Sequence, residues 1–345
     1  METNELNSNE DIQGNLFDFL KNRINKKTSL ASELMAVLDL SRSGVYKKLS
    51  GESKLSFTDV LKLARHFGFS IDQFIAERHD TIPFNVDAIR RQPHSYAEYI
   101  HNINKHFHRI SGSVDVKICY VTNEVPIFHY LQFPILFYFK LYVWNQTCWH
   151  IPNSNRNFSL REFTTDEELN DLRIKMLQDY YNYDGMEMWN TRFLDITLDQ
   201  IKYYAHSGIF ETKEDFILIF KELERLCKHL KKMAEKGYKF LTNKPDEPMG
   251  KLKVQMHELI ASSNIIYVTA EDFRVAFVTY DSPNFIRSSD DRFCDYTQSW
   301  IDSIVQRSLL ISGEGERERE RTFRLITKKM TRAKEELDSI LNYTY

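Results

Sequence analysis

The sequence predicts an α-helical N-terminal bundle of five short helices, followed by a mostly helical α+β region with a small antiparallel sheet. In the first part, apolar residues between Leu16 and Ala76 recur at helical spacing in short blocks that glycines separate. In the second part, long helical blocks alternate with a few short strand-like runs. The length of 345 residues agrees with two domains.

Changes in composition along the chain predict the domain boundaries. Residues 1–11 are polar and acidic, so we expect a disordered tail there. The helical bundle is predicted over residues 12–78. Residues 79–95 have mixed polarity and two prolines, which is typical of a linker. The α+β region is predicted over residues 96–341.

The composition excludes several classes of protein. Hydrophobic residues make up 42% of the chain, which is enough to bury a core. The four cysteines are far apart and form no CxxC pair, so we expect no metal site and no disulfide framework. Scattered thiols are typical of a protein in the reducing cytoplasm. These cysteines are Cys119, Cys148, Cys227 and Cys294.

The most apolar stretch of the chain covers residues 127–144. A membrane-spanning helix needs about 20 mostly apolar residues without polar interruptions. Because this stretch is interrupted, we expect a buried helix and no contact with a membrane. The interruptions are His129, Gln132, Pro134 and Lys140.

Residues 29–51 form two short helices joined by a tight turn, according to their pattern SLASELMAVLDLSRSGVYKKLSG. Asp39 lies at the turn, where a residue that tolerates left-handed geometry is needed. Ser41 is expected to cap the second helix through its hydroxyl group. Val45 and Leu49 are four residues apart and are expected to face the core. Other predicted N-caps in the bundle are Thr28 or Ser29, Ser56 and Ser70.

The outward face of the second helix carries the candidate binding residues Arg42, Ser43, Tyr46 and Lys47, with Lys48 on its flank. In a helix-turn-helix motif the second helix places its N-terminal residues at base edges in the major groove of DNA. Arg is the most frequent reader of guanine, and Ser bonds to bases or phosphates. This pattern predicts a sequence-reading surface, which also includes Ser41.

Local charge agrees with this prediction, although the whole chain has a net charge of −3. Residues 12–79 contain eleven basic and seven acidic residues, a net charge of +4. Basic side chains near the motif are candidates for contacts with phosphates, which supply most of the affinity for DNA. They are Lys21, Lys26, Lys27, Lys48 and Lys54.

The segments LSRSGVYKKLSGE and SFTDVLKLARHFGFSIDQFI resemble the Cro/repressor-type helix-turn-helix. More narrowly, they are similar to the BetR-type N-terminal domain found in Bacteroidetes regulators. The resemblance covers about residues 12–77. It implies a five-helix DNA-binding domain of a transcriptional regulator, in which Arg42, Ser43 and Lys47 occupy DNA-facing positions.

The remaining chain predicts these elements in order. A strand is expected around residues 114–120, and helices are expected over 126–149 (broken or not at Pro134), 166–181 and 198–238 (with a break near Ser207-Gly208). Three closely spaced strand-like runs, 252–259, 265–269 and 274–280, predict an antiparallel meander. Helices over 291–310 and 314–341 complete the chain.

No motif in this region indicates catalysis, so we expect no enzyme and no cofactor. His101, His106 and His108 are interpreted as a polar helix face rather than a metal site. The aromatic residues of 128–149 are interpreted as core, although a ligand pocket or a dimer face stays an alternative. The alternating Glu and Arg residues of 314–321 predict a solvated helix surface, and the apolar positions after them are expected to pack on a sheet or on a second copy.

Together these features predict a cytoplasmic transcriptional regulator whose partner is double-stranded DNA. The α+β region is expected to sense a small-molecule or peptide effector or to build a homodimer, because two half-sites add specificity that one small module lacks. The alternative is a protein-interaction adaptor whose N-terminal bundle binds a protein. The slightly acidic net charge favours that alternative.

Overall fold

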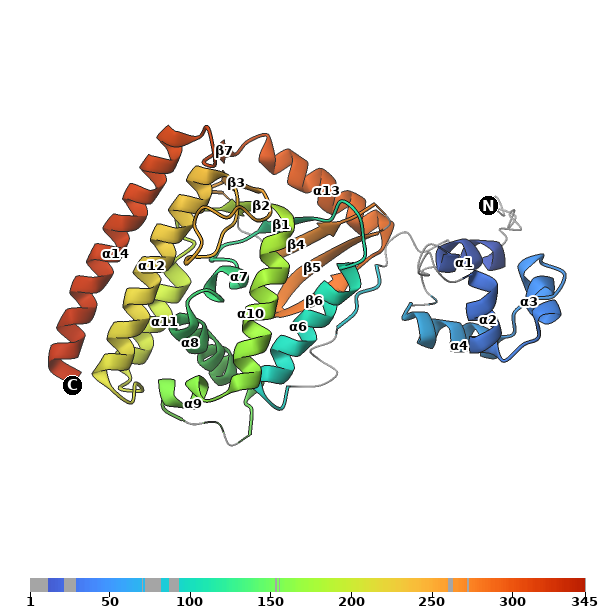
Figure 1. Cartoon of the computed structure of the whole chain (residues 1–345), viewed down its shortest axis with the longest axis horizontal. Coiled ribbons are helices and arrows are strands. Elements are labelled where there is room, and N and C mark those ends of the chain that lie inside the picture. Colours follow the sequence, from blue (N-terminus) through green and yellow to red (C-terminus); the bar gives the residue numbers. More distant parts are fainter. Residues whose placement is uncertain are drawn as a thin grey trace, which may run out of the picture. The chain divides into compact units, whose positions relative to one another are not determined.

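The computed structural model describes residues 12–21, 29–69, 71, 82–86, 93–152, 154, 156–259, 263–271 and 273–344 (Figure 1). The chain divides into two compact units, Met1–Pro83 and Phe84–Tyr345. The division falls inside the segment 79–95 that the sequence predicts as a linker. Each unit has its own hydrophobic core.

The first unit is helical. Its described helices are α1 (Ile12–Lys21), α2 (Leu30–Leu38), α3 (Arg42–Leu49) and α4 (Phe57–Phe67). Each of α2, α3 and α4 begins after a serine whose hydroxyl accepts a hydrogen bond from a backbone N–H of the first turn. The fully or almost fully buried residues at the centre of this unit are Leu20, Leu34, Val45 and Leu63. The predicted fifth helix lies outside the described residues.

The second unit is built on a sheet of seven strands in the order β6-β5-β4-β1-β2-β3-β7. The strands are β1 (Lys117–Val121), β2 (Asp184–Trp189), β3 (Leu252–Met256), β4 (Ile265–Thr269), β5 (Arg274–Asp281), β6 (Asn284–Ser288) and β7 (Leu309–Leu310). Strands β1, β2 and β3 are parallel to one another, whereas β4, β5 and β6 are antiparallel. The prediction of a small antiparallel sheet was therefore wrong, because the sheet is large and mixed.

The error has an identifiable cause at β3. The spacing between β3 and β4 is typical of a hairpin, but β3 pairs with β2 on one side and with β7 on the other. The chain leaves β3 and re-enters the sheet as β4 beside β1, with β2 and β1 lying between them. Long helical segments connect β1 to β2 and β2 to β3, as parallel strands require.

The helices predicted over 126–149, 166–181, 198–238 and 314–341 are confirmed with small differences in their bounds. The helix predicted over 291–310 ends at Val305, and β7 occupies the end of that range. No range was predicted for the helices at 96–110 and 160–164. The helices of the second unit are α6 (Tyr96–Ile110), α7 (Ile127–Tyr130), α8 (Pro134–Trp144), a π-helical segment (Asn145–Trp149), α9 (Leu160–Thr164), α10 (Glu167–Asn182), α11 (Asp195–His206), α12 (Lys213–Lys236), α13 (Asp291–Val305) and α14 (Glu316–Thr344). The predicted break at Pro134 is confirmed, because Pro134 is the first residue of α8. The predicted break at Ser207-Gly208 is also confirmed, with Gly208 at a positive φ of 61°.

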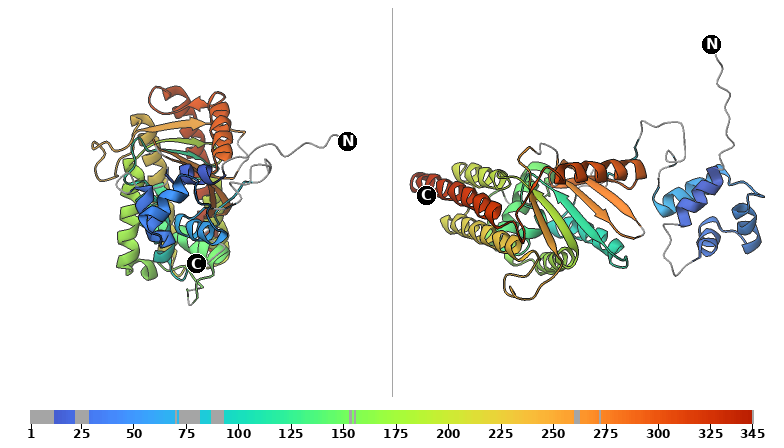
Figure 2. Two further views of the ribbon diagram at one scale, coloured as in Figure 1. Left: turned by 90° about the vertical axis from the view of Figure 1, so that its right-hand side faces the viewer. Right: turned by 90° about the horizontal axis from the view of Figure 1, so that it is seen from above.

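The two faces of the sheet are covered differently (Figure 2). On one face, Val121 and Met188 pack with Cys294 and Ile301 of α13. On the other face, alternate strand residues such as Ile118 join the larger core, which the remaining helices build. The strand side chains alternate between the two cores, which is the period of two expected for strands buried on both faces.

The predicted aromatic core is confirmed. Every aromatic residue of the block from Phe128 to Trp149 that the sequence singles out is buried. Several of the rings meet edge to face, for example Tyr142 with Phe158 at a centroid distance of 5.5 Å. These side chains are Phe128, Tyr130, Phe133, Phe137, Tyr138, Phe139, Tyr142, Trp144 and Trp149.

The apolar face of α14 packs inside the chain against α11 and α12. Two helices, with a smaller contribution from β7, therefore cover this face within the chain. The solvated surface predicted over 314–321 is confirmed except at Arg319, which is only 5% exposed. The Arg319 guanidinium donates to the carbonyl groups of Ile311 (3.0 Å) and Gly313 (2.9 Å), so it secures the chain before α14.

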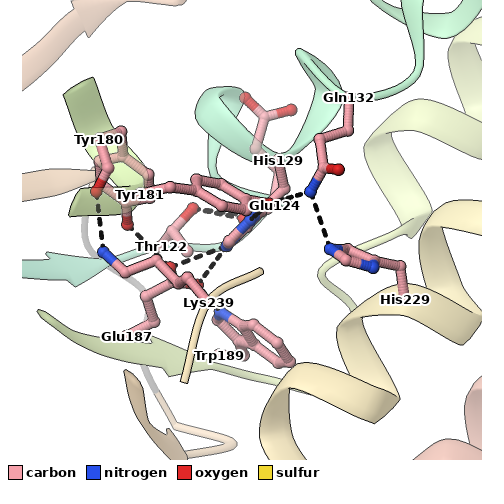
Figure 3. A network of polar contacts seen from close by, with 10 residues as sticks. All are labelled: Thr122, Glu124, His129, Gln132, Tyr180, Tyr181, Glu187, Trp189, His229 and Lys239. Carbon is pink, nitrogen blue, oxygen red and sulfur yellow. Dashed lines mark hydrogen bonds and ion pairs between the residues drawn. The ribbon is translucent and has the colours of Figure 1, made fainter. Parts of the chain in front are cut away.

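A buried polar cluster surrounds Glu187 on β2 (Figure 3). Its carboxylate accepts hydrogen bonds from Tyr180 (2.7 Å), Trp189 Nε1 (2.9 Å) and His129 Nε2 (2.8 Å). Burial on its own would raise the pKa of Glu187, but these hydrogen bonds and the neighbouring charges outweigh burial and lower it. Burial also lowers the pKa of Lys239, which donates to the Tyr180 carbonyl, to about 8. The cluster thus ties β2 to α7 and α10.

None of the described helices has the length and apolar character that crossing a bilayer needs. Among the residues that the structure describes, no group of three His, Cys, Asp or Glu side chains is arranged to hold a metal ion.

Candidate nucleic-acid interface

A tight turn between α2 and α3 sets the geometry of the candidate interface. Asp39 adopts the left-handed conformation predicted for it, with a φ of 55°, and its backbone N–H bonds to the Met35 carbonyl. Ser41 then starts α3, since its Oγ accepts from the Gly44 N–H at 3.3 Å. Ser41 is exposed, so its hydroxyl group can still donate to solvent or to a ligand. The chain therefore stops one helix and starts the next within three residues.

Helix α3 is attached to the core along one side. Val45 is fully buried, and Leu49 packs half-buried against the same core, as their spacing of four residues predicts. Leu40 in the turn also packs against this core. Because this side of α3 packs against the core, the opposite side faces solvent.

Four predicted side chains lie together on that outward side. Arg42, Ser43, Tyr46 and Lys47 are all exposed. The Arg42 guanidinium lies 5.7 Å from the centre of the Tyr46 ring, one helical turn away. Lys47 meets Glu52 at 3.4 Å, but an exposed pair of this kind contributes little and exchanges readily for another anion. The face therefore offers a forked guanidinium, a hydroxyl, a phenol and an ammonium group within about one and a half turns.

Lys48 occupies a different environment, on the flank of α3. Its ammonium is 3.1 Å from the Asp59 carboxylate and donates to the Lys54 carbonyl at 2.9 Å. The Lys48 side chain is only 13% exposed. Burial by itself would raise the pKa of Asp59, but hydrogen bonds from Ser56 and Lys48 outweigh it and lower that pKa. Lys48 thus joins α3 to the first turn of α4.

Residues 7–102 match the family model described as the BetR domain. The chain carries a BetR domain at these residues. The predicted resemblance is confirmed, and the match suggests a helix-turn-helix DNA-binding regulator. No curated protein and no solved structure matches the chain.

The BetR match is longer than the predicted resemblance over residues 12–77. It passes the end of the first compact unit at Pro83 and ends within α6. The family pattern therefore includes the connection to the second unit as well as the helix-turn-helix.

The remaining phosphate candidates of the BetR domain are dispersed. Lys54 is exposed in the segment between α3 and α4. Lys21 is exposed at the last position of α1, on a different helix from the outward face of α3. Lys26 and Lys27 lie outside the described residues. The structure thus brings Arg42, Ser43, Tyr46 and Lys47 onto one face and leaves Lys21 on another element.

Sequence reasoning missed a polar side chain that holds the BetR domain together. Gln13 on α1 donates to the carbonyl groups of Lys48 (2.7 Å) and Ser53 (3.1 Å) and accepts from the Leu55 N–H (2.8 Å). It satisfies one carbonyl group in the last turn of α3 and two backbone groups of the segment between α3 and α4. A lone polar residue beside the apolar positions of α1 gives little sign of such a role.

An exposed aromatic side chain was also missed. Phe57, the first residue of α4, is 73% exposed, although its neighbours in the pattern face the core. It follows Lys54 by three residues. An exposed aromatic ring is a surface on which a protein partner could pack.

Proposed function

We propose that this protein is a sequence-specific DNA-binding transcriptional regulator that reads an operator with the outward face of α3. The observation that carries the proposal is the grouping of four exposed side chains, Arg42, Ser43, Tyr46 and Lys47, on the rigidly held second helix of a helix-turn-helix. Arg42 is the first residue of α3, where a recognition helix meets base edges.

Each of these side chains has a separate role in the proposal. Arg42 donates its paired N–H groups to the O6 and N7 atoms of a guanine, and its contact with the Tyr46 ring restricts it beforehand. Ser43 and Lys47 bind neighbouring base edges or phosphates. Ser41, Lys21, Lys26, Lys27 and Lys54 are assigned to phosphates. We assign Lys48 mainly to the internal contact with Asp59, because its ammonium already has two partners.

The second unit is proposed to act as a homodimerisation and sensor region of a cytoplasmic protein. A single small module buries little DNA surface, and two copies on two half-sites raise both affinity and specificity. An effector bound by the second unit would change how the two copies are spaced. This part of the proposal rests on the physics of DNA recognition.

Selection of bound duplexes from random DNA tests the proposal with the full chain. We expect a defined motif whose binding weakens steeply as salt rises. The variant R42A should lose about 1–3 kcal/mol on the selected site and accept other bases at one position. R65A, which removes an exposed basic side chain on α4, is the matched control and should keep the base preference. Unchanged binding by R42A would refute the assignment of α3.

The exposed Phe57 ring favours the second candidate, a protein-interaction adaptor. Under that function the same selection returns weak binding without a motif. F57A would then abolish capture of the protein partner and leave DNA affinity as it was. Under the first function, a motif is recovered and R42A alters it.

A further inference from the structure

A small pocket in the second unit lies where β1 ends. Its volume is about 240 Å³, and Glu124, Gln200 and Asn264 supply polar groups to its wall. Glu124 follows β1 by three residues, and Asn264 immediately precedes β4, the antiparallel neighbour of β1. In open sheets with parallel strands, ligands bind outside the carboxyl ends of the strands. The pocket occupies such a position.

Glu124 presents a carboxylate whose charge is already balanced. Its Oε2 is 3.3 Å from the ammonium of Lys140, which is fully buried. Its Oε1 is 3.4 Å from the Ser282 hydroxyl, a long contact that leaves acceptor capacity on this oxygen. The pair as a whole carries no net charge. A charged ligand would therefore find no opposite charge to compensate it.

Two amide side chains present donors beside this carboxylate. The Oε1 of Gln200 accepts from Lys140 at 2.8 Å, so the oxygen of that amide is used and its NH₂ group is left for a ligand. The Oδ1 of Asn264 likewise accepts from Thr122 Oγ1 and the Asn123 N–H, each at 3.0 Å. In the part of the chain that the structure describes, no hydrogen bond is seen from the NH₂ group of either side chain.

Apolar walls complete the pocket. Trp144 and the exposed Tyr280 contribute aromatic rings, and Ile196, which is 43% exposed, contributes an aliphatic side chain. The pocket thus combines a carboxylate acceptor, two amide donors and aromatic rings. This combination suits a molecule with several hydroxyl groups and a face of C–H groups, because each hydroxyl can both donate and accept a hydrogen bond. Pockets for drug-sized ligands measure roughly 300–1,000 Å³, so this one fits a smaller molecule.

We infer that this pocket binds a small, neutral, polyhydroxylated molecule of monosaccharide size. The inferred binding site rests on the contacts of Glu124, Gln200 and Asn264 described above. Its role as the effector site of a regulator rests on the proposed function. In that role, one bound ligand would contact both Glu124, which follows β1, and Gln200 on α11.

Thermal unfolding of the full chain with single sugars tests the inference. The probes are D-glucose, D-galactose, D-mannose, D-ribose and L-arabinose, with inorganic phosphate and L-lysine as charged comparisons. Tryptophan fluorescence reports the second unit alone, because all four tryptophans lie in it. We expect at least one sugar to raise the Tm of this transition and neither charged probe to do so.

The variant I196W fills the pocket from an exposed position, so it should abolish the rise in Tm without unfolding the unit. L218W places the same ring at a position of α12 that is 38% exposed and outside the pocket, and it should respond like the wild type. A response to none of the sugars, a preference for a charged probe, or a response that persists in I196W would each overturn the inference.

Binding of the selected DNA duplex, measured on the same preparations, separates the two proposals. Duplex binding without any response to a sugar rejects the pocket and retains the regulator. A response to a sugar that I196W abolishes, with no duplex bound, retains the pocket and rejects the regulator. If both hold, the sugar should change the Kd for the duplex in the wild type and in L218W, but not in I196W.

Discussion

Lys47 and Lys48 are neighbours in the sequence, but the fold gives them different environments. The ammonium of Lys47 is exposed beside Glu52, whereas that of Lys48 is paired with Asp59 and the Lys54 carbonyl. Helical periodicity predicts that adjacent residues point about 100° apart, so it separates the face of α3 from its flank. It does not show that Asp59, from the next helix, meets Lys48.

Replacing each lysine by alanine should therefore have a different effect, one on DNA binding and the other on stability. K47A should weaken binding of the selected duplex by roughly 1–3 kcal/mol and flatten its salt dependence, with little effect on stability. K48A should destabilise the first unit by about 1–3 kcal/mol, because Asp59 loses a charged hydrogen-bond partner. Hydrogen exchange of the α3 and α4 amides and a salt titration of duplex binding measure both effects. Equal losses of stability in the two variants would contradict this division.

His229 on α12 is buried and neutral. Burial, together with the charges of His129 and Lys232, lowers its pKa from 6.5 to about 3. The Gln132 amide nitrogen lies 2.9 Å from His229 Nε2 (Figure 3), and it only donates, so a protonated Nε2 would place two donors against each other. A protonated ring would lose that contact.

This lowered pKa predicts a specific dependence of stability on pH. Between pH 6.5 and about 3 the unfolded chain binds a proton at His229 that the folded chain does not, so stability falls as the pH falls. The slope due to this group is at most about 1.4 kcal/mol per pH unit. Urea unfolding followed by tryptophan fluorescence should show a shallower slope for H229Q, whereas H206Q, at an exposed histidine, should keep the wild-type slope. An unchanged slope in H229Q would show that other groups cause the acid sensitivity.

At the scale of the element, α14 is the clearest case of a helix whose sequence pattern predicts a buried face but does not predict which elements cover that face. Five of its apolar residues recur at spacings of three or four positions, and these five are buried: Phe323, Ile326, Met330, Ala333 and Leu337. The pattern therefore predicts a covered face. That α11 and α12 cover it depends on the path of the chain through the sheet.

A core substitution on α14 should consequently affect stability and not assembly. M330A removes a side chain that is 6% exposed and should cost roughly 2–5 kcal/mol in the unfolding of the second unit. L325A, at a position 43% exposed on the same helix, should stay within about 0.5 kcal/mol of the wild type. Chemical denaturation followed by tryptophan fluorescence gives both values. A change in oligomeric mass in M330A without loss of stability would indicate that α14 pairs with a second copy.

Three strands, β2, β6 and β7, escaped prediction, and for β2 and β6 the residues make the reason clear. The pattern of β2, DGMEMW, places Glu187 in the middle of a buried strand, and charged residues are depleted in strands. The buried hydrogen bonds of Glu187 make this position tolerable, but they come from α7, α10 and β2 itself. Strand β6 is only five residues long and follows a tight turn, so its alternation is too brief to recognise.

At the scale of the whole molecule, the chain joins a BetR domain to a much larger mixed α/β unit. Residues 7–102 are less than a third of the 345 residues, so most of the chain lies outside the BetR domain. We propose that the second unit controls DNA binding by forming the dimer and by binding an effector.

Light scattering coupled to size-exclusion chromatography tests the proposed assembly. We expect a particle of twice the 41.0 kDa of one chain at micromolar concentration. The selected operator should then contain two half-sites whose centres are about 10 base pairs, or a multiple of that, apart. A monomeric mass, together with a selected operator that contains only one half-site, would reject the dimer.

The sequence by itself determined the local features of this protein. The caps Ser41 and Ser56, the left-handed turn at Asp39 and the inward Val45 depend on interactions within a few residues, so their pattern predicts them. Tertiary structure decided which strands pair, the role of Lys48 and the pocket beside Glu124. Each of these joins residues far apart in the chain, and the physical reason is that their contacts exist only after the helices and strands have packed.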